Sequence, residues 1–136
     1  MTPRRFALLA FPKLTFLDLI GVYDALRRVA PMGVAPGVSV TIVGTEPEVA
    51  DDSGLVVRAQ AVYPALAGYD MLFVPGGVGT RALMHDARFV EDGRVVTAGG
   101  VASSLDLGLY LVEKYWGAGA REKIAAQQEY TAYRAR

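Results

Sequence analysis

The sequence contains no cysteine, only one histidine and no long apolar run. Without cysteine the chain has no disulfide, no thiolate metal ligand and no thiol nucleophile. No apolar stretch approaches the roughly 18 to 20 residues that a membrane-spanning helix needs. Fourteen basic residues balance fourteen acidic ones, and neither sign forms a long block. This charge pattern argues against nucleic-acid and membrane partners, and we expect a cytoplasmic protein.

The length and composition are those of one folded unit. At 136 residues the chain fits a single domain over 1–136, and 52% of its residues are hydrophobic while 21% are charged, which is far from the composition of disordered chains. Arg4 and Arg5 before the apolar run 6–11 could be mistaken for the start of a signal peptide. The run stops at Pro12 without a small-residue cleavage site, so we interpret it as a buried strand.

The alternation of element types predicts an α/β fold. Short apolar runs at 6–11, 38–43 and 69–74 are typical of parallel strands buried on both faces. Between the first two runs, a helical pattern begins at Thr15 and ends before Pro31, and a strand–helix–strand unit implies a parallel sheet. The remaining predictions are an acidic loop over 46–52, a strand over 55–61, a helix over 80–85, a hairpin over 90–97 around Asp92-Gly93, and helices over 105–116 and 120–130.

Two features could carry chemistry. Asp18 lies in the first turn of the predicted helix after the first strand, and open parallel sheets bind ligands at this end of their strands. A carboxylate there also fits simple stabilisation of the helix dipole. The glycine turn 75–79 after the third buried strand can present backbone N–H groups to an oxyanion or a phosphate. Such turns serve close packing more often, so both interpretations stay open.

Other polar residues are weaker candidates. Asp24 is expected to be a solvated or packing-related acid, and His85, without a serine or cysteine motif beside it, is expected to be a surface residue. The aromatic residues expected in the core or at an interface are Tyr63, Tyr69, Tyr110, Tyr115 and Trp116. No metal-ligand spacing, phosphate-binding loop or strict dinucleotide fingerprint is present, so we predict no metal and no cofactor.

Several stretches together resemble the ThiJ/PfpI superfamily, and within it the isonitrile hydratase type. They follow the family's order over nearly the whole chain. The stretches are 11–26 (FPKLTFLDLIGVYDAL), 52–55 (DSGL), 69–79 (YDMLFVPGGVG), 92–101 (DGRVVTAGGV) and 105–107 (LDL). The resemblance implies a flavodoxin-like α/β fold, in which a mostly parallel sheet has helices on both faces.

The chain departs from the family at two positions and by one absence. Lys13 stands where glycine is usual and Val22 where proline is usual, and both could alter the entrance to the site. In the family, a strand, a sharp elbow with the nucleophilic cysteine and further strand and helix precede the hairpin. Here residues 85–90 join the two flanks directly. The resemblance thus implies an internal deletion of roughly 60 residues, or about two strand–helix units, that removes central strands.

The resemblance also assigns roles. Asp18 matches the acid that hydrogen-bonds the cysteine or activates water, and Gly76 with Gly77 matches the turn that lines the oxyanion site. Without the thiolate, the family's covalent chemistry should be lost. We expect an inactive protein, forming a homodimer, that retains binding of an isocyanide- or amide-like molecule. The alternatives are a cysteine-independent hydratase or hydrolase that uses Asp18, and a non-functional product of an internally deleted gene. A ligand-sensing part of a regulator is disfavoured, since no helix-turn-helix segment or basic face follows.

Overall fold

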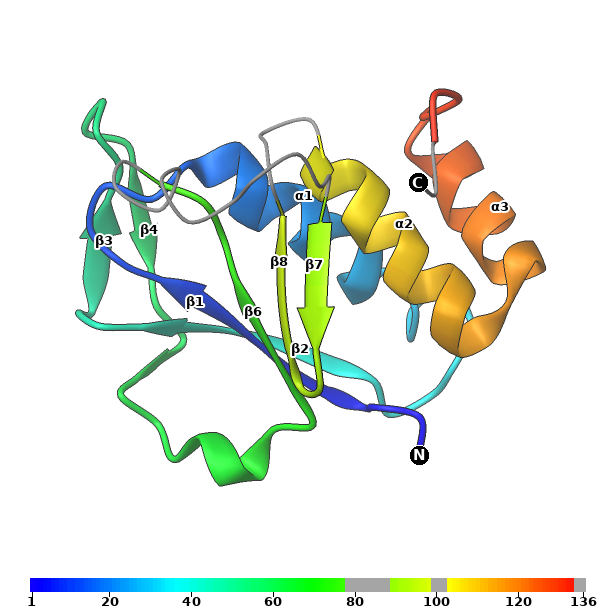
Figure 1. Cartoon of the computed structure of the whole chain (residues 1–136), viewed down its shortest axis with the longest axis horizontal. Coiled ribbons are helices and arrows are strands. Elements are labelled where there is room, and N and C mark those ends of the chain that lie inside the picture. The colour runs from blue at the N-terminus through cyan, green and yellow to red at the C-terminus, as the bar shows by residue number, and fades with distance from the viewer. Residues whose placement is uncertain (78–88, 99–102, 134–136) are drawn as a thin grey trace.

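The computed structural model describes residues 1–77, 89–98 and 103–133, and Figure 1 shows the arrangement of their elements. Strands and helices alternate along the first part of the chain, and two helices end it. In chain order the elements are β1 (Arg5–Ala10), α1 (Phe16–Arg27), β2 (Ser39–Gly44), β3 (Glu48–Ala50), β4 (Val56–Arg58), β5 (Ala61–Val62), the 3-10 helix η1 (Leu66–Gly68), β6 (Met71–Val74), β7 (Phe89–Asp92), β8 (Val95–Ala98), α2 (Ser103–Trp116) and α3 (Ala118–Gln127).

The main sheet has six strands in the order β5-β2-β1-β6-β8-β7. All neighbouring pairs are parallel except β7 and β8, which form the antiparallel hairpin predicted around Gly93. At the centre, Ala7 of β1 lies opposite Thr41 of β2 on one side and Leu72 of β6 on the other. The prediction of a mostly parallel α/β sheet of the flavodoxin type is confirmed.

The core lies between the sheet and the helices. Alternate residues of β1 and β6 point to this side because successive side chains of a strand face opposite ways, so Phe6, Leu8 and Phe73 are buried there. Helices α1 and α2 complete it with Leu19, Leu26, Leu107 and Leu111. Each fully buried leucine or phenylalanine contributes roughly 1.5–3 kcal/mol to the free energy of unfolding.

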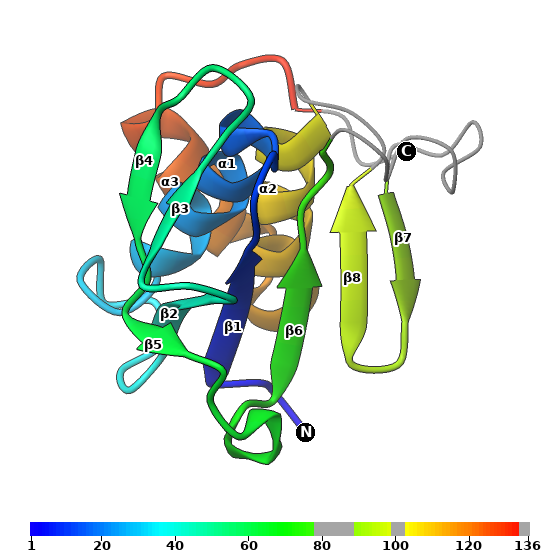
Figure 2. The same cartoon turned by 90° about the vertical axis from the view of Figure 1, so that its left-hand side faces the viewer.

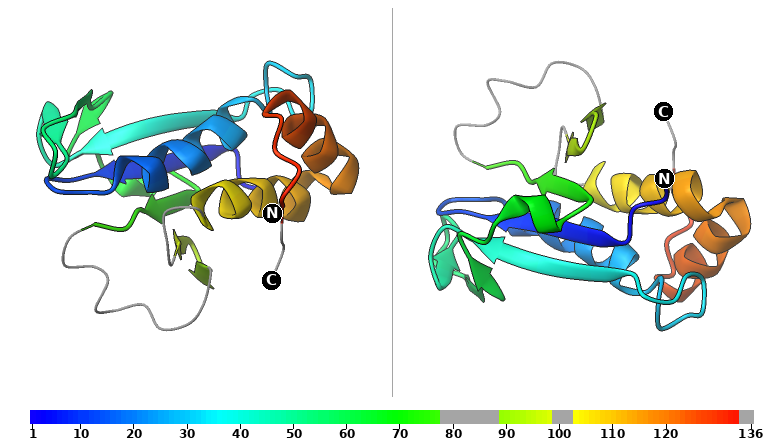
Figure 3. Two further views of the ribbon diagram at one scale, coloured as in Figure 1. Left: turned by 90° about the horizontal axis from the view of Figure 1, so that it is seen from above. Right: turned by 90° about the horizontal axis from the view of Figure 1, so that it is seen from below.

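The helices of the described residues all cover one face of the sheet. Figure 2 shows α1, α2 and α3 behind the strands, and the two views of Figure 3 agree. The opposite face carries the other set of alternating residues, among them the half-buried Leu9, Leu72 and Val74. The family resemblance predicted helices on both faces, and within the described ranges only one face has them.

The prediction of a loop over 46–52 is wrong in part. The acidic segment 46–52 contains the short strand β3, which pairs antiparallel with β4 and sets Val49 opposite Val57. Val49 is fully buried and belongs to the core, so its side chain helps to hold the segment against the body of the protein. The strand predicted over 55–61 is shorter, covering Val56–Arg58. The helix predicted over 80–85 lies outside the described residues.

Helices α1 and α2 approach each other closely where both carry glycine. A Cβ on Gly108 would lie 2.7 Å from the Cβ of Ala25 and 3.0 Å from the carbonyl oxygen of Gly21. A Cβ on Gly21 would lie 2.2 Å from Oγ of Ser104. The Ser104 hydroxyl in turn donates a hydrogen bond of 2.8 Å to the carbonyl of Leu17. The glycines therefore let the two helix backbones pack against each other.

The segment after α3 is tied back to α1 through Asp24. Its carboxylate forms ion pairs with Arg27 and Arg28, each at 2.9 Å, and accepts a hydrogen bond of 3.0 Å from Gln128. Burial acts to raise the pKa of Asp24, but the hydrogen bonds from Gln128, Arg28 and Arg27 outweigh it and hold this pKa below its usual value. Asp24 is therefore a packing residue, as the sequence indicated.

Replacing Gly108 by alanine should destabilise the protein, because the added methyl group has no space between α1 and α2. We expect Gly108→Ala to lower the free energy of unfolding by about 1–3 kcal/mol. Gly119→Ala in α3 is the matched control, since a Cβ at this position would have no neighbouring atom within 4 Å. That change should raise stability by up to about 1 kcal/mol through helix propensity. Urea titrations of both variants test this, and equal effects would contradict the close helix contact.

Candidate functional site

The candidate site lies at the carboxyl end of the sheet, where the loop after β1 meets the loop after β6. Leu14 and Gly77 form an isolated antiparallel bridge between the two loops. The N–H of Thr15 donates a hydrogen bond of 2.8 Å to the carbonyl of Gly76. Helix α1 begins directly afterwards, at Phe16. The start of α1 is thereby fixed against the glycine turn.

Asp18 lies in the first turn of α1 and is 3% exposed. Its Oδ2 accepts a hydrogen bond of 3.1 Å from the backbone N–H of Gly76. The structure therefore brings together two of the residues that the sequence analysis selected, although they are far apart in the chain. A buried carboxylate at a helix N-terminus is favoured by the helix dipole, and its bond to Gly76 is charge-assisted.

The glycine turn combines close packing with this polar contact. A Cβ on Gly77 would lie 2.8 Å from the carbonyl oxygen of Lys13 and 3.1 Å from Cα of Leu14, so any larger residue would force the loops apart. The Gly76 N–H already donates to Asp18. An anionic ligand would therefore compete with Asp18 for that donor. The oxyanion role of Gly76 and Gly77 stays a prediction.

Lys13 adopts a backbone conformation that normally requires glycine. Its φ is 64°, in the left-handed region, where a Cβ costs roughly 1–2 kcal/mol. Its N–H donates a hydrogen bond of 2.9 Å to the carbonyl of Ala50, at the end of β3, and its side chain is exposed. This hydrogen bond links the β3–β4 hairpin to the mouth of the site. The family resemblance indicated a left-handed backbone conformation here, because glycine is usual in the family where this chain has Lys13.

The other sequence candidates lie elsewhere in the fold or outside the described residues. His85 lies outside the described residues, and Asp24 belongs to the α1 ion pairs. Tyr110, Tyr115 and Trp116 pack against the core, as predicted. Tyr63 does not belong to the core, because its side chain is 76% exposed. Over 1–77, 89–98 and 103–133, no cluster of three or more potential ligand side chains could hold a metal ion. No helix among the described residues is both long and apolar enough to cross a membrane.

Comparison with solved structures identifies the fold. An AraC family transcriptional regulator from Pseudomonas putida is 17% identical with a TM-score of 0.79, over 93% of this chain and 100% of that one. The chain has the fold of ThiJ/PfpI and DJ-1 proteins. A ThiJ/PfpI family protein from Pseudomonas syringae is 21% identical with a TM-score of 0.72, over 96% of this chain and 76% of that one.

A DJ-1 protein is similar as well. Oxidized DJ-1 from Toxoplasma gondii is 15% identical with a TM-score of 0.70, over 93% of this chain and 99% of that one. No family model matches the sequence, and no curated protein does so either. At these identities the likeness concerns the fold, and the chemistry has to be argued from the residues of the site.

Replacing Lys13 by glycine should stabilise the protein, because glycine adopts a φ of 64° without steric strain. We expect Lys13→Gly to raise the free energy of unfolding by about 0.5–1 kcal/mol after the greater backbone entropy of the unfolded chain is subtracted. Lys13→Ala is the control, since it removes the same charge and keeps the Cβ. Chemical denaturation measures both, and an equal gain for the alanine variant would assign the effect to charge instead of strain.

Proposed function

We propose that this chain is a ThiJ/PfpI superfamily protein of the isonitrile hydratase type that has lost catalysis and binds a small molecule beside Asp18. The observation that carries the proposal is the buried Asp18 carboxylate, held 3.1 Å from the Gly76 N–H, in a chain that contains no cysteine. The acid and the glycine turn are in place, and the family's nucleophile is absent.

Catalysis by the family's route needs a group that this chain lacks. A covalent intermediate needs a nucleophile, and a thiolate is the one that this family uses. Asp18 could act alone as a base toward water, but its Oδ2 already accepts the Gly76 hydrogen bond, so a water would have to compete for that oxygen. The cysteine-independent hydratase is therefore the weaker alternative. The non-functional product of an internally deleted gene is the other alternative, and it predicts neither binding nor turnover.

The Asp18 carboxylate, as a hydrogen-bond acceptor, determines which class of ligand suits this site. A carboxylate is an acceptor-only group when it is ionised, so it suits a ligand with an N–H donor. An amide-like molecule, such as the N-substituted formamide formed by hydration of an isocyanide, supplies that donor. We expect the protein to bind it as a homodimer, in keeping with the sequence-based expectation.

A regulatory role is a second candidate, favoured by one comparison. The solved chain from Pseudomonas putida is described as an AraC family transcriptional regulator, and the alignment spans its full length. A sensing role needs ligand binding and no turnover. Like the main proposal, it requires a protein without catalytic activity, whereas the hydratase alternative requires turnover.

The experiment measures turnover and binding on the same protein. Cyclohexyl isocyanide is offered to the wild type and Asp18→Asn, and N-cyclohexylformamide is titrated into both by calorimetry. Asparagine can still accept the Gly76 hydrogen bond but loses the charge. We expect no turnover above buffer, and binding of the formamide that Asp18→Asn weakens by roughly tenfold, or about 1.4 kcal/mol.

Asp52→Asn is the matched control, because Asp52 is an exposed turn residue and the change removes the same charge. It should leave formamide binding unchanged. Wild-type turnover that disappears in Asp18→Asn would establish the hydratase and overturn the inactive assignment. The absence of formamide binding by a folded wild type would overturn the ligand-binding proposal.

A further inference from the structure

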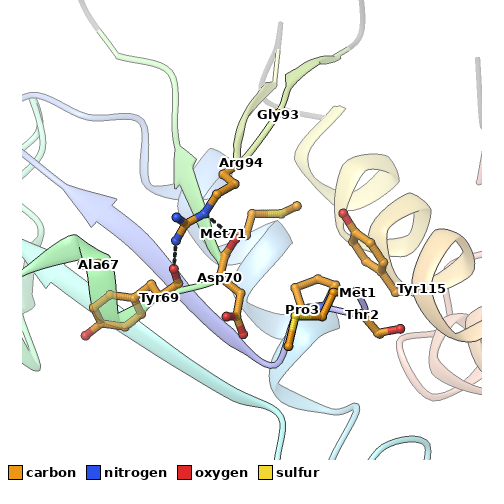
Figure 4. A pocket seen from close by; sticks show the side chains of 10 residues that line it. All are labelled: Met1, Thr2, Pro3, Ala67, Tyr69, Asp70, Met71, Gly93, Arg94 and Tyr115. Carbon is orange, nitrogen blue, oxygen red and sulfur yellow. Dashed lines mark hydrogen bonds between the residues drawn. The ribbon is translucent and has the colours of Figure 1, made fainter.

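Arg94 lies between two hollows at the amino end of the sheet, opposite the end that carries Asp18. The larger one, of about 420 Å³, lies between the chain start, β6, the β7–β8 turn and the end of α2 (Figure 4). The smaller one, of about 260 Å³, lies between η1, β6 and β8. The two share the lining residues Ala67, Tyr69, Met71 and Arg94. A ligand that contacts Arg94 can therefore reach both.

The Arg94 guanidinium is held in place by neutral groups. Its Nε donates a hydrogen bond of 3.1 Å to the carbonyl of Asp70, and its Nη2 donates to the carbonyl of Tyr69. Among the described residues no carboxylate is in direct ion-pair contact with it, and Asp70 attracts it at longer range. An arginine has five N–H donors, and those that remain are oriented before a ligand arrives.

Asp70 is a carboxylate near this guanidinium, and its hydrogen bonds go to other groups. Its Oδ2 accepts hydrogen bonds from the backbone N–H groups of Arg4, at 2.8 Å, and Arg5, at 2.9 Å. Figure 4 shows its carboxylate pointing away from the Arg94 guanidinium. The bonds from Arg4 and Arg5 hold the pKa of Asp70 below its usual value, and the charges of Arg5 and Arg94 act in the same direction. The three arginines outnumber Asp70 and Asp92, the last residue of β7, so this end of the sheet favours anions.

The smaller hollow supplies an apolar wall beside the cation. Leu66, Leu72 and Val95 line it, and Leu66 is 46% and Val95 42% exposed. Covering such side chains gives roughly 25 cal/mol for each Å² of apolar surface removed from water. A fixed cation next to exposed apolar side chains suits a molecule with an acidic group at one end and an apolar body at the other.

We propose that this end of the sheet is a second ligand site, which binds a small amphipathic organic anion. Its acid group, a carboxylate or a phosphate monoester, lies on Arg94. Its apolar body covers Leu66, Leu72 and Val95. The site is separate from the Asp18 site, since β6 begins beside the one and ends beside the other.

Calorimetry on the full chain with octanoate, octyl phosphate and 1-octanol tests the proposal. We expect both anions to bind, and the alcohol to bind at least roughly tenfold more weakly because it lacks the charge-assisted hydrogen bonds. Tighter binding of octanoate assigns the site to carboxylates, and tighter binding of octyl phosphate assigns it to phosphate monoesters. Equal binding of the alcohol, or no binding of either anion, would overturn the proposal.

Arg94→Gln locates the site, with Arg58→Gln as its matched control. Arg58 is an exposed arginine of β4 paired with Glu48, so its replacement makes the same change in net charge. We expect Arg94→Gln to weaken the binding of both anions by roughly tenfold or more. Arg58→Gln should change their affinity by less than roughly twofold. Equal losses of anion affinity in the two variants would show that the effect comes from the net charge of the protein and would contradict the proposed site.

Leu66→Ser provides an independent test if Arg94→Gln fails to fold, which circular dichroism detects. Leu66 lies in the exposed turn η1, and its replacement shortens only the apolar wall. It should weaken octanoate binding by roughly threefold or more, while Leu55→Ser, the same change at an exposed leucine outside both hollows, leaves octanoate binding unchanged. Equal losses of octanoate binding in the two variants would contradict the apolar wall and overturn the proposal.

Discussion

Two hydrogen bonds join the start of α1 to the loop after β6 and set the position of this helix on the sheet. Thr15 donates to the carbonyl of Gly76, and Gly76 donates in return to the Asp18 carboxylate. These bonds fix where α1 begins and how it leaves the sheet. Helix α1 can then meet α2 at Gly21 and Gly108, and the core between helices and sheet closes around that contact.

These bonds also give Asp18 a structural role. Asp18 is buried and bonded to the turn that it faces, so it stabilises the fold whether or not a ligand binds. The ligand proposed at Asp18 and the anion proposed at Arg94 occupy opposite ends of β6, so each can be tested without disturbing the other.

The sequence predicted the parts of the fold that depend on local apolar patterns. The central strands and the three described helices fall where the patterns placed them, and so does the turn at Gly93. β3 was missed because one buried residue, Val49, lies in an acidic segment. The pairing of β6 with β8 was not predictable, since it joins segments whose partners depend on the whole sheet. Arg94 was missed for the same reason, because that pairing brings it to the carbonyls of Tyr69 and Asp70.

A single α/β core with helices packed on one face of its sheet should unfold cooperatively. Thermal unfolding followed by far-ultraviolet and near-ultraviolet circular dichroism, beside size-exclusion chromatography, measures this cooperativity. We expect a single sharp transition, coincident in both signals, from a defined monomer or dimer. A broad or absent transition in a soluble aggregate would contradict it, because the core around Phe6, Leu8 and Phe73 would then not hold the two sites in place.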